Sequence, residues 1–175
     1  LNPEYLRYYL AAKLSSGIDD LDLNLEDFAL RVNADLVGKV INIASRCAGF
    51  IHKGFDGMLA ENLDNPGLLA EIQSIEAEVV EHFTSREYGK AIRLIMAQAD
   101  KANQYINDKE PWVLAKNDKQ SVELQAICST GINAFRLLLC YLKPVLPGLA
   151  EKAETFLNIE PLIWKDVDFL LTNHR

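Results

Sequence analysis

The sequence predicts an all-α protein, an antiparallel helix bundle with about five main helices. Apolar residues recur at three- and four-residue spacing along almost the whole chain. Clusters of Pro, Gly, Asn and Asp interrupt that spacing at intervals typical of helix lengths. The 175 residues are 49% hydrophobic and 25% charged, as in a globular domain, and a chain of this length buries a sizeable core without disulfides or metal.

The first part of the chain is expected to hold a short helix, a connection and one long helix. The Asn-Pro-Glu run at residues 2–4 is a helix start that leads to a helix ending near Lys13. Residues 18–23 alternate apolar and acidic side chains, which fits either a short strand or an extended linker. Asn24 then caps a long helix that continues to about Lys53.

Three further helices are expected in the rest of the bundle. The turn at 64–67 precedes a third helix over residues 68–83. Ser85 caps a fourth helix, which stops before Pro111 because the residue preceding proline is disfavoured in helical geometry. A fifth helix covers about 118–142.

The end of the chain is expected to be less regular. Pro144 and Pro147 end the fifth helix, and a last short helix covers about 152–157. Residues 158–175 are expected to form an irregular tail, with Trp164 as a clamp that pins the tail to the bundle.

Composition excludes several function classes. A net charge of −7 excludes a wholly basic nucleic-acid coat, although a local basic site on an acidic body remains open. No apolar run is long enough to span a bilayer, and no membrane partner is expected. The three cysteines are scattered without a C-x-x-C pair, which favours a reduced, cytoplasmic protein. The three histidines are also scattered, so no metal site is expected.

No pattern predicts a catalytic residue in this chain. There is no Gly-rich phosphate loop after a strand and no Ser or Cys in a nucleophile context. The acidic residues Asp19, Asp20 and Asp22 fit a solvated turn before a helix better than a cation site. We therefore expect no catalysis from this chain on its own.

The long second helix carries a polar stripe. At 100° per residue, one narrow face holds Asp35, Lys39, Asn42, Arg46, Gly49 and Lys53. The amide of Asn42 and the guanidinium of Arg46 lie one turn apart, and together they offer donors and an acceptor suited to base edges or phosphates. An ordinary solvated helix face explains the same pattern.

The Pro111-Trp112 pair is the second candidate feature. A Trp beside a helix-ending proline on a rigid loop is suited to stack on an unpaired base. The apolar residues that follow, 113–115, favour the alternative in which the indole packs inward.

Strings of residues along essentially the whole chain resemble a known family. They are LRYY at 6–9, AKLSS at 12–16, IDDLDLN at 18–24, RVNAD at 31–35, ASR at 44–46, REYGKAIR at 86–93, PW at 111–112 and YLKPVLP at 141–147. In order and spacing they resemble the C-terminal, anticodon-binding part of bacterial methionyl-tRNA synthetase, a class I aminoacyl-tRNA synthetase. The resemblance implies a helical bundle that reads the CAU anticodon loop of methionine-accepting tRNA.

The resemblance also implies roles for four residues. Trp112 matches the residue on which anticodon bases stack, Pro111 the residue that shapes its loop, and Asn42 and Arg46 the residues that hydrogen-bond to anticodon bases. These roles agree with how single-stranded RNA is read, by stacking and base-edge contacts. Local basic residues must supply the phosphate contacts, and the candidates are Arg46, His52, Lys53 and Lys116.

The same resemblance implies how the chain is organised. Residues 1–23 resemble part of the linker to a catalytic domain, residues 24–157 the anticodon-binding bundle, and residues 158–175 a tail. ATP and zinc are expected only in an upstream catalytic domain, and any homodimer only through a further C-terminal domain. No DNA partner is expected. The rival hypothesis is a helical scaffold that docks a protein partner through its Trp112 loop.

Overall fold

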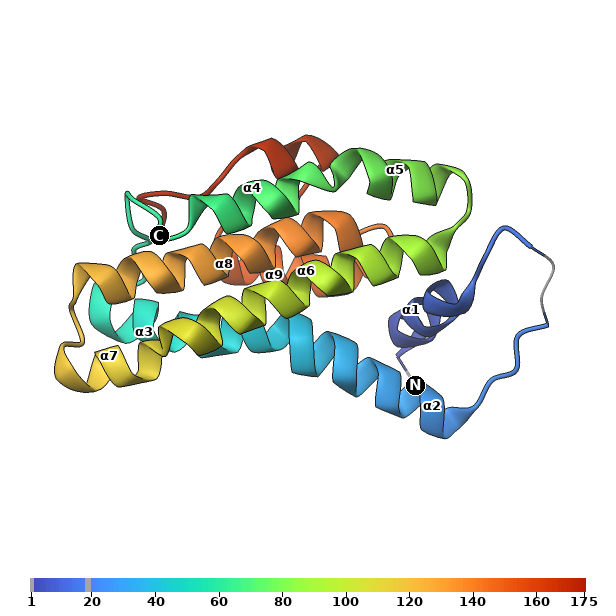
Figure 1. Cartoon of the computed structure of the whole chain (residues 1–175), viewed down its shortest axis with the longest axis horizontal. Coiled ribbons are helices and arrows are strands. Elements are labelled where there is room, and N and C mark those ends of the chain that lie inside the picture. Colours follow the sequence, from blue (N-terminus) through green and yellow to red (C-terminus); the bar gives the residue numbers. More distant parts are fainter. Residues whose placement is uncertain (1, 18–19) are drawn as a thin grey trace.

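One helix, α8 (Val122–Leu142), lies at the centre of the computed structural model, which describes residues 2–17 and 20–175 (Figure 1). Every residue from Ile127 to Leu142 is buried, because helices pack around α8 on all sides. A helix that is apolar around its whole circumference is the kind that a helical protein places in its interior.

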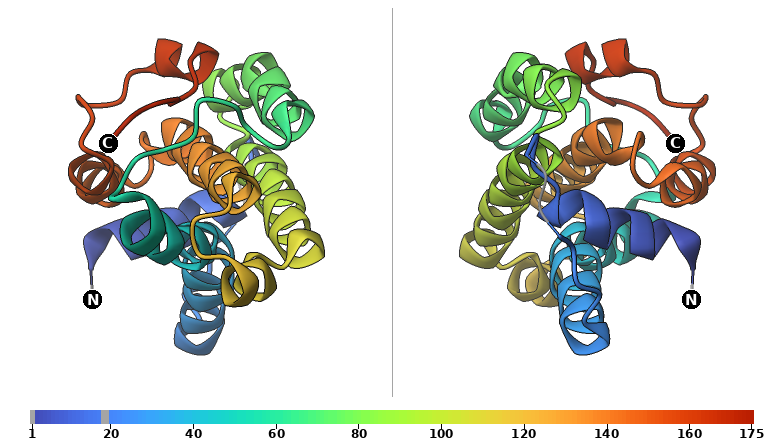
Figure 2. Two further views of the ribbon diagram at one scale, coloured as in Figure 1. Left: turned by 90° about the vertical axis from the view of Figure 1, so that its left-hand side faces the viewer. Right: turned by 90° about the vertical axis from the view of Figure 1, so that its right-hand side faces the viewer.

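Eight other α-helices surround or flank α8, and among the described residues there is no β-strand. In chain order, the elements other than α8 are α1 (Pro3–Lys13), α2 (Leu25–Arg31), the π-helical segment η1 (Val32–Ile41), α3 (Asn42–Phe55), α4 (Pro66–Ser74), α5 (Glu76–Thr84), α6 (Tyr88–Lys109), α7 (Pro111–Asn117), α9 (Pro147–Leu157) and the 3-10 helix η2 (Trp164–Asp168). The predicted all-α class is confirmed. The views from the two ends show the helices arranged around α8 (Figure 2).

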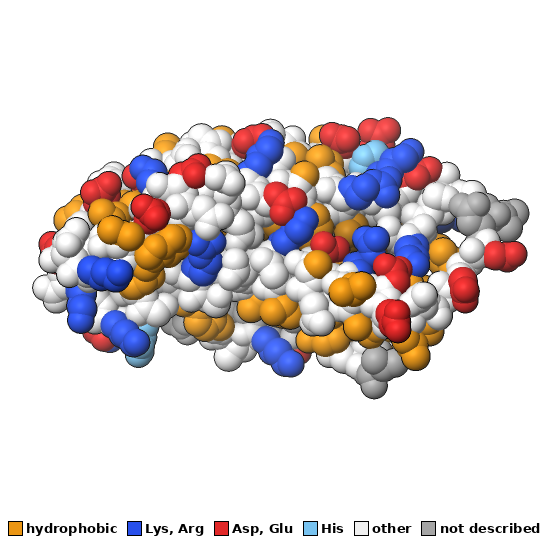
Figure 3. All heavy atoms as spheres, turned by 60° about the horizontal axis from the view of Figure 1, so that its bottom comes forward, with side chains coloured by type: hydrophobic (Ala, Val, Ile, Leu, Met, Phe, Trp, Pro, Cys, Tyr) orange, Lys and Arg blue, Asp and Glu red, His pale blue; other side chains and the backbone are white. Residues whose placement is uncertain are grey.

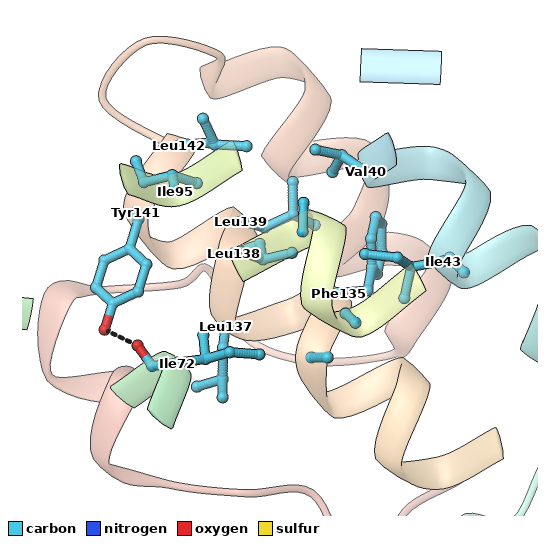
Figure 4. Packing of buried hydrophobic residues seen from close by; sticks show 14 of the residues in the cluster. Val40, Ile43, Ile72, Ile95, Phe135, Leu137, Leu138, Leu139, Tyr141 and Leu142 are labelled. Atoms are coloured by element: carbon cyan, nitrogen blue, oxygen red, sulfur yellow. Dashed lines mark hydrogen bonds between the residues drawn. The ribbon is translucent and has the colours of Figure 1, made fainter. Parts of the chain in front are cut away.

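The core follows the predicted apolar spacing. Side chains of α8 interlock with those of the helices around it, as the close view shows for Leu138, Leu139 and Val40 (Figure 4). The hydroxyl of Tyr141 is buried and donates to the carbonyl oxygen of Ile72 at 2.9 Å. A buried phenol needs such a partner, since an unsatisfied hydroxyl is costly to bury.

Two of the predicted helix starts are confirmed in detail. The side chain of Asn2 accepts from the backbone N–H of Glu4, and that of Asn24 accepts from those of Glu26 and Asp27. The predicted Ser85 cap is wrong. Ser85 follows α5 and its hydroxyl donates to the carbonyl of His82, while α6 begins three residues later.

The long second helix is present as a continuous helical run over residues 25–55, but its middle is not α-helical. The run consists of α2, the ten-residue π segment η1, and α3, which ends where Asp56 takes a left-handed conformation. A π-helix pairs residues five apart instead of four, and π segments within α-helices are frequent at functional sites. The uniform angle of 100° per residue therefore holds within α3 but not through η1.

Other boundaries differ from the prediction. The predicted helix over 68–83 is two helices, α4 and α5, which meet at the buried residue Ile75. Pro111 and Pro147 are the first residues of α7 and α9. An N–H group at this position has no partner within the helix, so proline, which has no N–H, costs nothing there. The predicted fifth helix starts at Val122 rather than 118, capped by Ser121.

The N-terminal helix α1 is attached to the bundle. The hydroxyls of Tyr8 and Tyr9 donate to Asp35 at 2.8 Å and to Asp27 at 2.9 Å. Residues 20–24 lie in neither a helix nor a strand, which fits the linker alternative, whereas residues 18 and 19 of the predicted alternating stretch lie outside the described residues.

The C-terminal tail packs on α8. Trp164 packs edge-on against Phe83, with ring centroids 6.5 Å apart, and in a tilted arrangement against Tyr141 at 5.7 Å. The amide of Asn133 bonds both backbone groups of Leu171, at 2.7 and 2.9 Å. The prediction that Trp164 clamps the tail is confirmed, and η2 gives the tail a regular turn that the sequence did not indicate.

Candidate nucleic-acid interface

The polar stripe predicted on the long helix faces α6 along part of its length. Three side-chain contacts join the two helices, and together they are called the polar seam here: Lys39 to Asp100 at 2.9 Å, Asn42 to Asn103 at 2.9 Å, and Arg46 to Asn107 at 2.6 Å. Each contact pairs residues 61 positions apart in the chain.

The seam has a regular spacing because both helices present residues one turn apart. Asn42 and Arg46 lie four residues apart on α3, and Asn103 and Asn107 lie four residues apart on α6. Residues at i and i+4 share a helix face, so two helices packed side by side bring such pairs into contact. Asn42 and Arg46 are both half-buried, which leaves part of each side chain open to solvent.

Arg46 also lies over Trp112. The guanidinium carbon of Arg46 is 4.7 Å from the centroid of the indole, a cation–π contact. The indole is half-buried and packs against the hydrophobic core along one side. The ring therefore packs inward on one side and reaches the surface beside Arg46 on the other.

Trp112 lies at a helix junction and not on a loop. Helix α6 ends at Lys109, as predicted, and Glu110 turns the chain with a left-handed φ of 45°. Pro111 then starts α7 and is itself buried, so it fixes where the next residue, Trp112, begins. Pro111 and Trp112 are therefore the first two residues of a short helix, where the sequence predicted a loop.

The solvent side of this region is open, and it carries basic residues beside acidic ones such as Asp108 and Glu110. A Cβ added to Gly49 would meet nothing within 4 Å, and His52, Lys53 and Lys116 are exposed. The end of α3 touches the α7–α8 connection, because a Cβ added to Gly54 would meet the carbonyl oxygen of Lys119. Figure 3 shows Lys and Arg side chains and a His beside apolar side chains at the end of the molecule where α3 and α7 lie.

Buried contacts fix the inner side of α3. Cys47, the residue after Arg46, is fully buried against Cys128 and Gly131 of α8. The contact with Cys128, together with burial, holds the pKa of the Cys47 thiol well above its usual value, so the sulfur is a neutral packing group. The three cysteines are free, as the sequence predicted, and all three are buried.

The structure thus brings Asn42, Arg46 and Trp112 together, and Pro111 precedes Trp112 at the start of α7. Sequence reasoning missed the α6 side of the seam, Asp100, Asn103 and Asn107. Their spacing of three and four residues on a predicted helix was a signal, but nothing in the sequence says which helix faces them.

No metal centre or membrane span is found in the described part of the chain. No group of three or more His, Cys, Asp and Glu side chains there is arranged to hold a metal ion. Within the same residues, each helix is either too short or too polar to cross a bilayer.

Comparison with protein families decides the assignment. A model described as the anticodon binding domain of methionyl tRNA ligase matches residues 58–173, and a model of class I tRNA synthetases (M) matches residues 1–48. The chain belongs to the methionyl-tRNA ligase family. The matched segments include Pro111, Trp112, Asn42 and Arg46.

Solved structures of Mycobacterium tuberculosis methionyl-tRNA synthetase have the same fold. The form bound by methionyl-adenylate (Met-AMP) superposes with a TM-score of 0.88 at 24% identity over 98% of this chain, and the free-state form with 0.86 at 22% over 99%. A further structure, in complex with methionyl-adenylate, gives 0.86 at 23% over 99%. This chain spans about a third of those chains, 35–37% of their length.

Proposed function

We propose that this chain recognises methionine-accepting tRNA by reading its CAU anticodon loop. Family membership points to an anticodon-binding domain, and the contact between Arg46 and Trp112, beside the exposed part of Asn42, is the observation that carries the finer proposal. A planar indole, a guanidinium and an amide within one surface region suit the splayed bases of a loop.

Each of the four residues has a separate task in this mechanism. Trp112 offers a ring for base stacking, worth ~1–3 kcal/mol per base. Arg46 offers only donors, and Asn42 offers both a donor and an acceptor, so the two can match base edges. Pro111 sets the backbone that places the indole.

The contact over the indole has a consequence for stacking. Arg46 covers one face of Trp112, so a base that stacks there displaces the guanidinium. The displaced contact is worth ~0.5–2 kcal/mol, which is less than or similar to the stacking that replaces it. The freed guanidinium then reaches the base edge or a phosphate beside it.

Phosphate contacts come from local cations despite the net charge of −7. His52, Lys53 and Lys116 are exposed near the seam, and no ion pair within the described part of the chain engages Lys53 or Lys116. Counterion release at such contacts makes RNA binding fall as salt rises.

The ligase reaction is assigned to the rest of such a ligase, and so are the ATP and zinc that the resemblance implies. Whole relatives are about three times as long as this chain. A cytoplasmic location forms part of the same proposal, in agreement with the buried free cysteines.

A binding titration tests the proposal. The 175-residue chain is titrated with a CAU anticodon stem-loop and with loops changed at one anticodon base. We expect preference for CAU, and in Trp112→Ala a loss of ~1–3 kcal/mol of binding free energy with unchanged helical circular dichroism. Equal affinity for all loops would favour the scaffold alternative instead.

A further inference from the structure

Asn103 of α6 contacts three different groups with one amide. Its Nδ2 donates to the carbonyl oxygens of Lys39 and Ala99, both at 3.0 Å, and its Oδ1 accepts from Nδ2 of Asn42 at 2.9 Å. Lys39 belongs to the π segment η1, so Asn103 ties α6 to the residues that immediately precede α3.

These contacts determine the orientation of both amides. Backbone carbonyls only accept hydrogen bonds, so Asn103 must turn its NH2 group toward Lys39 and Ala99. Its oxygen therefore faces Asn42, and Asn42 donates a hydrogen bond to it from its own NH2 group. A rotated Asn103 amide would place an oxygen against two carbonyl oxygens and leave its NH2 group without those partners.

The orientation of Asn42 decides what the surface presents. With Nδ2 bound to Asn103, the Oδ1 of Asn42 receives no hydrogen bond from any described residue. Arg46 has no acceptor, and one of its N–H groups is bound to Asn107. The Asn42–Arg46 pair therefore presents a single acceptor, Oδ1, next to several donors.

We propose that Asn103 is a positioning residue that makes this pair selective for a base with an amino group at pyrimidine C4 or purine C6. Cytosine and adenine offer such a donor to Oδ1, whereas uracil and guanine place a carbonyl oxygen at the corresponding position. This inference rests on the proposed function. It adds that selectivity depends on a residue that itself contacts no base.

Single anticodon changes that exchange amino for carbonyl groups test the inference. Stem-loops with CAU, UAU and CGU differ by cytosine to uracil or by adenine to guanine. The wild-type chain should disfavour at least one of the changed loops by about tenfold or more. In Asn103→Leu, which keeps the branching of the side chain but frees the Asn42 amide to rotate, that preference should fall to about threefold or less.

Two further variants separate positioning from a loss of fold. In an Asn42→Ala background, Asn103→Leu should leave the ratio of affinities unchanged, because it acts through Asn42. Gln73→Leu is the matched control, since it removes another amide contact between segments, Nε2 of Gln73 to the carbonyl oxygen of Val167 at 2.7 Å, at a site outside the seam. This control should keep the wild-type preference.

The outcomes distinguish the inference from the proposed function. If Asn103→Leu weakens all three loops equally, or if it lowers the preference further when Asn42 is already Ala, the positioning role is overturned. If the wild-type chain itself binds the three loops equally, the proposed function fails, and the inference fails with it.

Discussion

Gly131 gives a quantitative test of how α8 packs against α3. A Cβ added to Gly131 would lie 2.5 Å from the sulfur of Cys47 and 3.4 Å from Cδ1 of Ile106. Cys47 and Ile106 are fully buried, so neither can move into solvent. In Gly131→Ala the sulfur has to retreat by about 1 Å to reach ordinary contact distance.

The expected loss of stability follows from two opposing effects. Overpacking of a close-packed core costs ~1–3 kcal/mol. Replacing glycine by alanine inside a helix stabilises the folded state by ~1 kcal/mol. Gly131→Ala should therefore lower the free energy of unfolding by up to ~2 kcal/mol. Gly49→Ala is the matched control, because Gly49 is also helical but has open space around it, so it should raise stability by up to ~1 kcal/mol.

Urea unfolding followed by circular dichroism measures these changes in stability. A double-mutant cycle tests whether the sulfur of Cys47 is the atom that opposes the new methyl group. In Gly131→Ala with Cys47→Ala, the new methyl group occupies the place of the sulfur. The cycle should then give a favourable coupling on the order of 1 kcal/mol. A Gly131→Ala chain as stable as the Gly49→Ala chain would refute the argument, and so would a cost that persists after the sulfur is removed.

Three other perturbations probe the interface and the backbone. Arg46→Ala should lower the discrimination between stem-loops by ~1–3 kcal/mol; in the same titrations, a loss equal for all loops would reassign Arg46 to phosphate contact. Glu110→Gly should raise thermal stability by ~0.5–1 kcal/mol, because glycine adopts the left-handed conformation of this residue without steric cost, and a lowered melting temperature would contradict this. Lys13 holds the pKa of Asp27 below its usual value, so the stabilisation by this pair is complete above the ordinary carboxyl pKa of ~4 and is lost as the pH falls through the lowered value. Asp27→Asn should remove that part of the acid dependence in urea unfolding, and an unchanged pH profile would show that the pair contributes nothing.

Local signals in the sequence were sufficient for part of the site. Asn42 and Arg46 fall on one face at helical spacing, and Pro111 marks the end of α6, so their neighbourhoods were predictable from residues close in the chain. The start of α1 and the start of α2 were predictable for the same reason, since a capping Asn acts on backbone groups two or three residues away.

The remaining features depend on contacts between distant segments. Asn103 meets Asn42 only because α6 packs beside α3 in one register, which no local pattern specifies. The break at Ile75 has neither Pro nor Gly to mark it, and the residue at the break is buried in the core. The π segment η1 could not be predicted from a spacing of 100° per residue, because that spacing assumes α-helical geometry throughout.

The polar side chains of α8 make distant parts of the chain fold and unfold together. Ser129 and Thr130 accept from the backbone of Ala60 and Asp64, and Arg136 donates to the carbonyl oxygens of Asp166 and Phe169. Arg136 is only 4% exposed, and detachment of the tail would leave its guanidinium without those two carbonyl partners. The amide hydrogens that anchor the tail should therefore exchange with solvent almost as slowly as those of the central helix, instead of fraying as chain ends usually do.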